Sequence, residues 1–149
     1  MSVTALARGR ARAQIPAETR RRVAARVRRA LRALGRARSS ATLVFTDDDE
    51  IRALNRDFRQ HDRATDVLSF HLQQLAGEAD PAGDGVELGD IVISVETARR
   101  RARGKRLASE FERLAIHGLC HLFGHDHKKT AEAKVMFALE ARLRRLPLA

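Results

Sequence analysis

Residues 117–127 read His117-Gly118-Leu119-Cys120-His121-Leu122-Phe123-Gly124-His125-Asp126-His127 and contain four of the chain's six histidines. His117 and His121 are four positions apart, so on a helix their rings lie one turn apart on the same face. Gly124 lets the backbone leave such a helix, because glycine tolerates the left-handed conformation that a helix end requires. His127 follows this break and can turn back toward the first two rings. The stretch therefore predicts a helix that ends in a cluster of three imidazoles.

The spacing of these histidines is typical of a catalytic zinc site. Two histidines one turn apart are more often a packing or surface feature, but a third one after a glycine break favours a metal with one open position. Zinc peptidases of the metzincin type use the same H-x3-H-x2-G-x2-H spacing. They carry a glutamate as general base directly after the first histidine, where this chain has Gly118. The spacing thus indicates a metal hydrolase of a different reaction class.

The composition is that of a globular chain. Its 149 residues are 44% hydrophobic and 32% charged, which fits one domain with a real core. No apolar run approaches the length of a membrane span, and residues 1–14 lack the apolar core of a secretory signal. The single cysteine excludes an internal disulfide framework and fits a reducing compartment. We therefore expect a cytoplasmic protein.

The positive charge is concentrated at the N-terminus. Residues 1–38 hold twelve arginines and one acidic residue, Glu18, for a net charge of +11, whereas the remaining 111 residues carry seventeen basic and eighteen acidic groups. This bias favours contact with a polyanion such as RNA, although a solvated helix face in an arginine-rich chain is the alternative. We expect residues 1–14 to form a disordered basic tail and residues 15–149 to form a single metal-dependent hydrolase domain.

Hydrophobic periodicity predicts an α+β (mixed α/β) fold. The chain should contain a small sheet of about four strands packed with about five helices, one of them a zincin-like helix that carries the metal. Residues 73–87 should form a long acidic loop. The strands with a clear signal are 41–45, 65–72 and 88–94, and the helices are 16–34, 47–58, 95–103, 107–123 and 131–146.

Three motifs of this chain resemble motifs of the YbeY family of metal-dependent endoribonucleases, which are rRNA maturation factors. Residues 117–127 are similar to its H-G-x-x-H-L-x-G-Y-D-H signature, residues 54–70 to L-N-x-x-(aromatic)-R-x-x-D-x-P-T-D-V-L-S-F, and residues 88–94 to L-G-D-I-x-I-S. The chain departs from these patterns at Ala64, where the family has proline, and at His125, where it has tyrosine. His125 adds one more potential metal ligand, whereas we expect Cys120 to be a core residue.

The resemblance implies a set of functional residues. His117, His121 and His127 would bind one zinc ion per chain. Arg59 matches the functional arginine of the family and would stabilise charge on a phosphate. Asp126 would accept the second N–H of a ligand imidazole. No general base can be assigned, although Asp66 and Ser69 lie in the matched block.

The resemblance also implies a function. The chain would be a single-strand-specific metal-dependent endoribonuclease in rRNA (16S 3′-end) maturation and ribosome quality control. Its partners would be ribosomal RNA and small ribosomal subunit precursors, with small-subunit proteins and an assembly GTPase as further candidates, and it would act as a monomer away from membranes. Two alternatives stay open. One is a zinc-dependent peptidase or other small hydrolase, and the other is a non-catalytic ribosome assembly factor with a structural metal.

Overall fold

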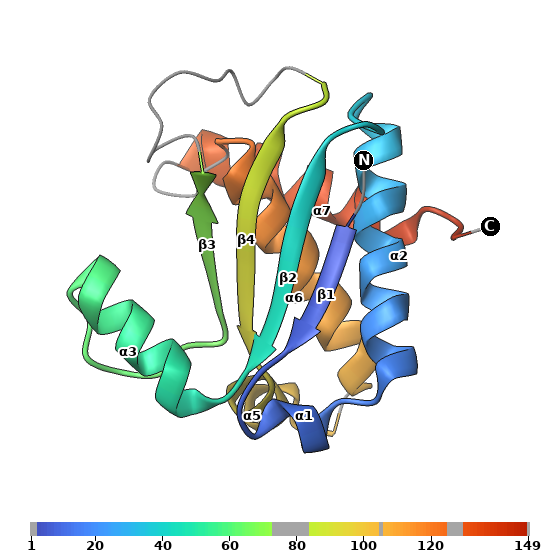
Figure 1. Ribbon diagram of the computed structural model, residues 1–149. Coiled ribbons are helices and arrows are strands. Elements are labelled where there is room, and N and C mark those ends of the chain that lie inside the picture. Colours follow the sequence, from blue (N-terminus) through green and yellow to red (C-terminus); the bar gives the residue numbers. More distant parts are fainter. Residues whose placement is uncertain (1–2, 73–83, 105, 125–129, 149) are drawn as a thin grey trace.

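A computed structural model describes residues 3–72, 84–104, 106–124 and 130–148, which form a four-stranded sheet and six helices (Figure 1). This confirms the predicted mixed α/β architecture. The sequence predicted about five helices, and the additional one is the single-turn helix α1. The elements are β1 (Val3–Ala7), α1 (Ala11–Gln14), α2 (Ala17–Ala33), β2 (Ser40–Thr46), α3 (Asp48–Arg59), β3 (Val67–His71), β4 (Glu87–Ser94), α5 (Val95–Ala102), α6 (Leu107–Leu122) and α7 (Thr130–Arg145).

The strands lie in the order β1-β2-β4-β3. β1 pairs with β2 and β2 pairs with β4 in parallel, whereas β3 pairs with β4 in antiparallel orientation. β1 and β3 are therefore the two edge strands. In Figure 1, α6 and α7 lie behind the sheet, α2 stands beside β1, and α3 stands beside β3. This arrangement places the C-terminal half of α6 next to β3.

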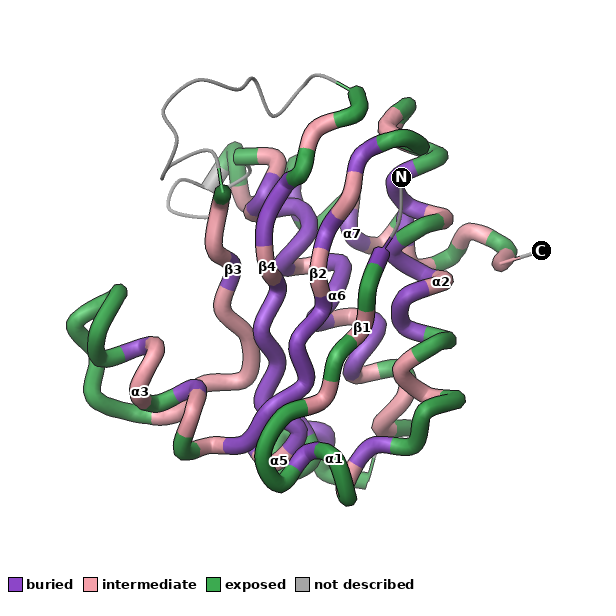
Figure 2. Tube along the Cα trace, viewed as in Figure 1, coloured by how far each residue is buried: buried purple, intermediate pink, exposed green. Residues whose placement is uncertain are grey.

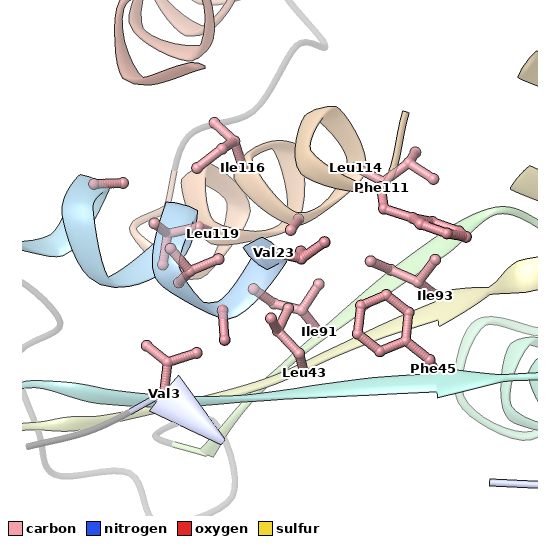
Figure 3. Close-up of a cluster of buried hydrophobic side chains, with 14 of the residues drawn as sticks. Val3, Val23, Leu43, Phe45, Ile91, Ile93, Phe111, Leu114, Ile116 and Leu119 are labelled. Carbon is pink, nitrogen blue, oxygen red and sulfur yellow. The ribbon is translucent and has the colours of Figure 1, made fainter. Parts of the chain in front are cut away.

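Alternate residues of the central strands pack on opposite faces of the sheet, as the period of a strand requires. Leu43 and Phe45 of β2 belong to the main core with α2 and α6, and Phe45 meets the ring of Phe111 edge-on at 5.6 Å (Figure 3). Val44, between them, belongs to a smaller cluster with Ile51 of α3. The C-terminal half of α6 is buried nearly throughout (Figure 2), as its apolar sequence predicts.

The disordered tail expected over residues 1–14 is wrong for residues 3–14. β1 pairs with β2 from Val3 opposite Ala41 to Ala7 opposite Phe45, and Ala11 of α1 is fully buried. Arginine-rich local sequence suggested disorder, but the strand is stabilised by its pairing with β2 and by packing against α2. Arg10 also donates hydrogen bonds to carboxylates of two other elements.

The acidic loop predicted over residues 73–87 lies mostly outside the described residues. Its last residue, Glu87, is the first residue of β4. Among the described helices, none combines the length and apolar character needed to cross a membrane.

Candidate functional site

His117 and His121 lie on the last two turns of α6, and their rings converge. Their Nε2 atoms are 3.1 Å apart, and the ring planes meet at 81°. Two nitrogens bound to one tetrahedral zinc ion at about 2.05 Å are about 3.3 Å apart. The pair of nitrogens is therefore spaced as two ligands of a single metal ion would be.

Glu140 of α7 fixes the orientation of His117. Its Oε1 atom lies 2.7 Å from His117 Nδ1, and the glutamate is only 5% exposed. A carboxylate oxygen can only accept here, so Nδ1 donates to Glu140 and Nε2 is the nitrogen that faces His121. A carboxylate behind a histidine in this way is typical of metal-binding imidazoles. The donor set thus fits a divalent metal.

Glu140 is not among the residues that the sequence motifs indicate. Its spacing indicates a buried position, because Glu140 lies four residues after the buried Met136 and three before the buried Leu143, on the same face of the helix. A glutamate on the inward face of an amphipathic helix needs a buried partner. That partner could not be identified before α6 and α7 were seen side by side.

Gly118 lies where α6 packs tightly against β4. A Cβ atom at this position would lie 2.6 Å from Cγ2 of Ile91, which is fully buried. The carbonyl oxygen of Gly118 accepts a hydrogen bond from Ser69 Oγ of β3 at 3.2 Å. The position after the first histidine therefore has no room for a side chain, and Ser69 joins the edge strand to the histidine helix.

Arg59, the last residue of α3, reaches the open edge of β3. Its Nη2 atom donates to the carbonyl oxygen of Ser69 at 2.6 Å, and its guanidinium carbon lies 5.7 Å from the centre of the Phe70 ring. Phe58 meets the same ring edge-on at 5.4 Å and is 63% exposed. Ser69 is thus a shared neighbour of Arg59 and of Gly118, which follows His117 directly.

His71 is a second residue near the site that the sequence motifs do not indicate. Burial and the nearby charge of Arg59 lower the pKa of His71, although a hydrogen bond with the Leu122 backbone acts in the opposite direction. His71 is two positions after Ser69 on β3, so the two side chains lie on the same face of the sheet. It therefore places a further imidazole near the end of α6.

Cys120 and Asp66 take structural positions. Cys120 is buried, and its burial, helped by the charge of Glu140, raises the pKa of its thiol to about 12. It is therefore a protonated core residue, as expected. Asp66 accepts from the backbone N–H of Val67 and pairs with Arg101 at 3.1 Å. These contacts hold Asp66 before the start of β3, at the opposite end of the strand from His71.

The remaining predicted site residues, His125, Asp126 and His127, lie outside the described residues. α6 ends as its sequence predicts, since Gly124 adopts a positive φ of 86°. Over residues 3–72, 84–104, 106–124 and 130–148, no group of three or more His, Cys, Asp or Glu side chains is arranged to hold a metal ion. The described part of the site thus consists of a histidine pair, its glutamate and the Arg59–Ser69 contact.

Comparison with known proteins places this geometry in a family. A family model described as endoribonuclease YbeY matches residues 9–146. The chain belongs to the YbeY family. The match begins well before the three motifs, which agrees with the ordered N-terminal segment.

Individual relatives support the assignment to the YbeY family. An endoribonuclease YbeY of Anaeromyxobacter dehalogenans is 45% identical over 131 residues, which cover 87% of this chain and 65% of the relative. Its counterpart in Aquifex aeolicus is 44% identical over 110 residues, or 72% of this chain and 69% of the relative. The chain spans just under two thirds of the length of the Anaeromyxobacter relatives.

A solved structure has the same fold. The solution structure of TM1509 from Thermotoga maritima matches with a TM-score of 0.65, over 95% of this chain and 86% of that protein. The two sequences are 24% identical. This similarity supports the fold independently of the sequence motifs.

Proposed function

We propose that this chain is a metal-dependent endoribonuclease that cleaves single-stranded RNA during maturation of the 16S 3′ end and in ribosome quality control. One observation carries the proposal. The Nε2 atoms of His117 and His121 lie 3.1 Å apart, and the buried carboxylate of Glu140 orients the His117 ring. The chain that carries this pair belongs to a family whose relatives are named endoribonucleases. This arrangement supports a metal-binding site over a pair of packed histidines, because metal-bound imidazoles commonly donate their second N–H to a carboxylate.

The proposed cofactor is one zinc ion per chain, held by His117, His121 and His127. Asp126 is proposed to accept the second N–H of a ligand imidazole. When bound, zinc supplies a Lewis acid and lowers the pKa of water to about 7. Glu140 keeps the proton of His117 on Nδ1, which leaves Nε2 as the donor atom.

Arg59 is proposed as the catalytic arginine. Its contact with Ser69 uses one of five guanidinium N–H donors, so further donors remain within the described part of the chain for a phosphate. A guanidinium can bind two phosphate oxygens at once, and this contact strengthens as negative charge develops in the transition state. Because Ser69 is also bonded to Gly118, the arginine is positioned relative to the helix that carries the histidines.

The packing of Gly118 weighs against the peptidase alternative. A glutamate after the first histidine would have to occupy the space of the Ile91 side chain. Without that glutamate, the site lacks the group that a metzincin uses as general base. A phosphodiester hydrolase with an arginine beside the metal fits the site better.

The partners and location are also proposals. The proposed substrates are ribosomal RNA and small ribosomal subunit precursors. Small-subunit proteins and an assembly GTPase are proposed as binding partners of a monomeric, cytoplasmic protein.

A cleavage assay tests the proposal directly. Purified protein is incubated with single-stranded RNA, duplex RNA and a small-subunit rRNA precursor, before and after metal removal by a chelator. We expect cleavage of the single-stranded and precursor RNAs, loss of cleavage on chelation, and recovery when zinc is added back. Stoichiometric metal without cleavage of any RNA would favour the assembly-factor alternative.

A further inference from the structure

The edge of the sheet opposite β3 carries a hollow between β1 and α2. It has a volume of about 180 Å³. Val3 and Ala5 line it from β1, and two alanines and three arginines line it from α2. β1 and α2 run side by side at this edge (Figure 1). The hollow is therefore built by two ordered elements and not by a loop.

The sequence of α2 explains why arginines surround this space. Arg21, Ala24 and Arg28 are three and four positions apart, so they lie on one face of the helix. The stripe through Val23 and Val27 is buried against the sheet instead. A small alanine between long arginines leaves an indentation, because its side chain ends where the arginine stems continue. The positive charge thus lines a depression in the surface.

The arginines of this hollow, Arg20, Arg21 and Arg28, form no ion pair with a carboxylate within the described part of the chain. Arg20 donates to the backbone carbonyl of Ile15, and Arg28 donates to that of Val3, each at 3.4 Å. Each guanidinium has five N–H donors, so most donors remain available. Three cations around one depression repel one another unless an anion joins them.

Some other arginines of the same basic segment are paired with carboxylates. Arg26 of α2 is buried and pairs with Glu112 at 3.0 Å, and Arg10 donates to Glu96 and Asp49. The positive charge of residues 1–38 is therefore not uniform over the surface. It remains uncompensated at the hollow.

We propose that this hollow binds a phosphate group of an RNA backbone at a distance from the histidine pair. Guanidinium groups recognise phosphate oxygens through paired N–H bonds. Among the described residues, the lining contains no aromatic side chain on which a base could stack, so the contact would not depend on sequence. The identification of RNA as the ligand rests on the proposed function. The preference of the hollow for a phosphate group rests on its arginines alone.

The position of the hollow predicts a dependence on RNA length. β1 and β3 are separated by two strands, which corresponds to about 14 Å at about 4.8 Å per strand spacing. Arg59 lies at β3, and the hollow lies at β1. A dinucleotide is too short to occupy both, whereas a longer single strand can do so. The hollow should therefore affect the binding of long RNA only.

Fluorescence anisotropy over a range of salt concentrations tests the proposal. All proteins carry His121→Ala to prevent cleavage, and the RNA is a labelled single strand of about 20 nucleotides. Arg21→Gln/Arg28→Gln should raise Kd about fivefold or more and lower the salt slope by about 0.7 for each phosphate that the variant no longer neutralises. Arg103→Gln/Arg106→Gln removes the same charge from the segment between α5 and α6 and should change Kd less than about twofold.

Two further measurements distinguish a specific phosphate site from nonspecific electrostatic attraction. Arg21→Lys/Arg28→Lys keeps the charge but removes the paired donors, so it should also weaken binding. Wild-type affinity in this variant, or equal losses in the glutamine and control variants, would overturn the proposal. A loss of binding to polyglutamate with RNA binding unchanged would assign the hollow to an acidic protein and would also overturn it.

Cleavage assays without the His121→Ala change keep this inference separate from the proposed function. If the wild-type chain cleaves RNA while Arg21→Gln/Arg28→Gln binds like the control, the hollow is not an RNA site and the proposed function stands. If no RNA is cleaved but the double variant loses RNA binding, the hollow stands and the proposed activity fails. Thermal unfolding checks each variant, and Arg21→Gln alone replaces the double variant if that one does not fold.

Discussion

The Nδ1 atom of His117 lies 2.7 Å from Oε1 of Glu140, so a partly buried hydrogen bond joins the histidine helix α6 to the C-terminal helix α7. This contact determines which nitrogen of His117 faces His121. It also makes the geometry of the candidate metal centre depend on a residue 23 positions further along the chain.

Replacement of Glu140 should therefore weaken metal binding. Glu140→Gln keeps the size of the side chain but removes the carboxylate that accepts from Nδ1. We expect zinc affinity to fall about 10- to 100-fold, as for other carboxylates behind metal-bound histidines. Competition with a chromophoric chelator measures this affinity. Glu132→Gln, on an exposed position of the same helix, is the control, and equal affinities in the two variants would exclude the orienting role.

Replacement of Arg59 should separate catalysis from metal binding. Arg59→Gln removes the proposed phosphate contact, and we expect kcat/KM for RNA cleavage to fall about 10²- to 10³-fold with metal content unchanged. Arg56→Gln removes the same charge from the exposed surface of α3 and should retain activity. Loss of bound metal in Arg59→Gln would show that the arginine acts on the fold of the site instead.

Gly118→Ala should destabilise the protein although alanine favours helix by about 1 kcal/mol. The new methyl group would overlap the Ile91 side chain, and such overpacking costs about 1–3 kcal/mol. Urea unfolding measures the difference. The cost should shrink in an Ile91→Ala background, because the obstructing atom is gone. A gain in stability from Gly118→Ala alone would contradict the close approach.

The contacts of Glu96 predict a loss of stability in acid. Hydrogen bonds from Arg10 and from the backbone of Asp48 lower the pKa of Glu96 to about 2, from an ordinary value of 4.5. A carboxylate with a lowered pKa in the folded state stabilises the protein above its unfolded pKa, and this contribution is lost as the pH falls from about 4.5 to about 2.

Urea unfolding at several pH values tests this expectation. Glu96→Gln should reduce the change in unfolding free energy over that range, whereas Glu132→Gln should not. An identical pH dependence in wild type and Glu96→Gln would show that the Arg10 contact contributes no stability.

Local sequence predicted the parts of the fold that depend on local patterns. The runs at residues 41–45 and 88–94 form β2 and β4, and the helix that carries His117 and His121 ends before Gly124. β1 was missed because a five-residue strand gains its stability from pairing with β2 and from α2. No local pattern contains that information.

The candidate site, like the fold, could be predicted from sequence only where it depends on local patterns. The spacing of His117 and His121 follows from helix geometry, so their convergence could be expected from sequence. The Arg59–Ser69 contact required the packing of α3 against β3, and the Glu140 contact required the packing of α7 against α6. These contacts depend on tertiary structure, which periodicity does not describe.

Metal stoichiometry by native mass spectrometry tests the central claim most directly. Wild-type protein loaded with zinc should carry one ion per chain, and His121→Ala, which retains the rest of α6, should carry none. Thermal unfolding in the absence of metal would show whether the variant is folded. A full zinc ion bound to folded His121→Ala would contradict the assignment of the histidine pair as the metal site.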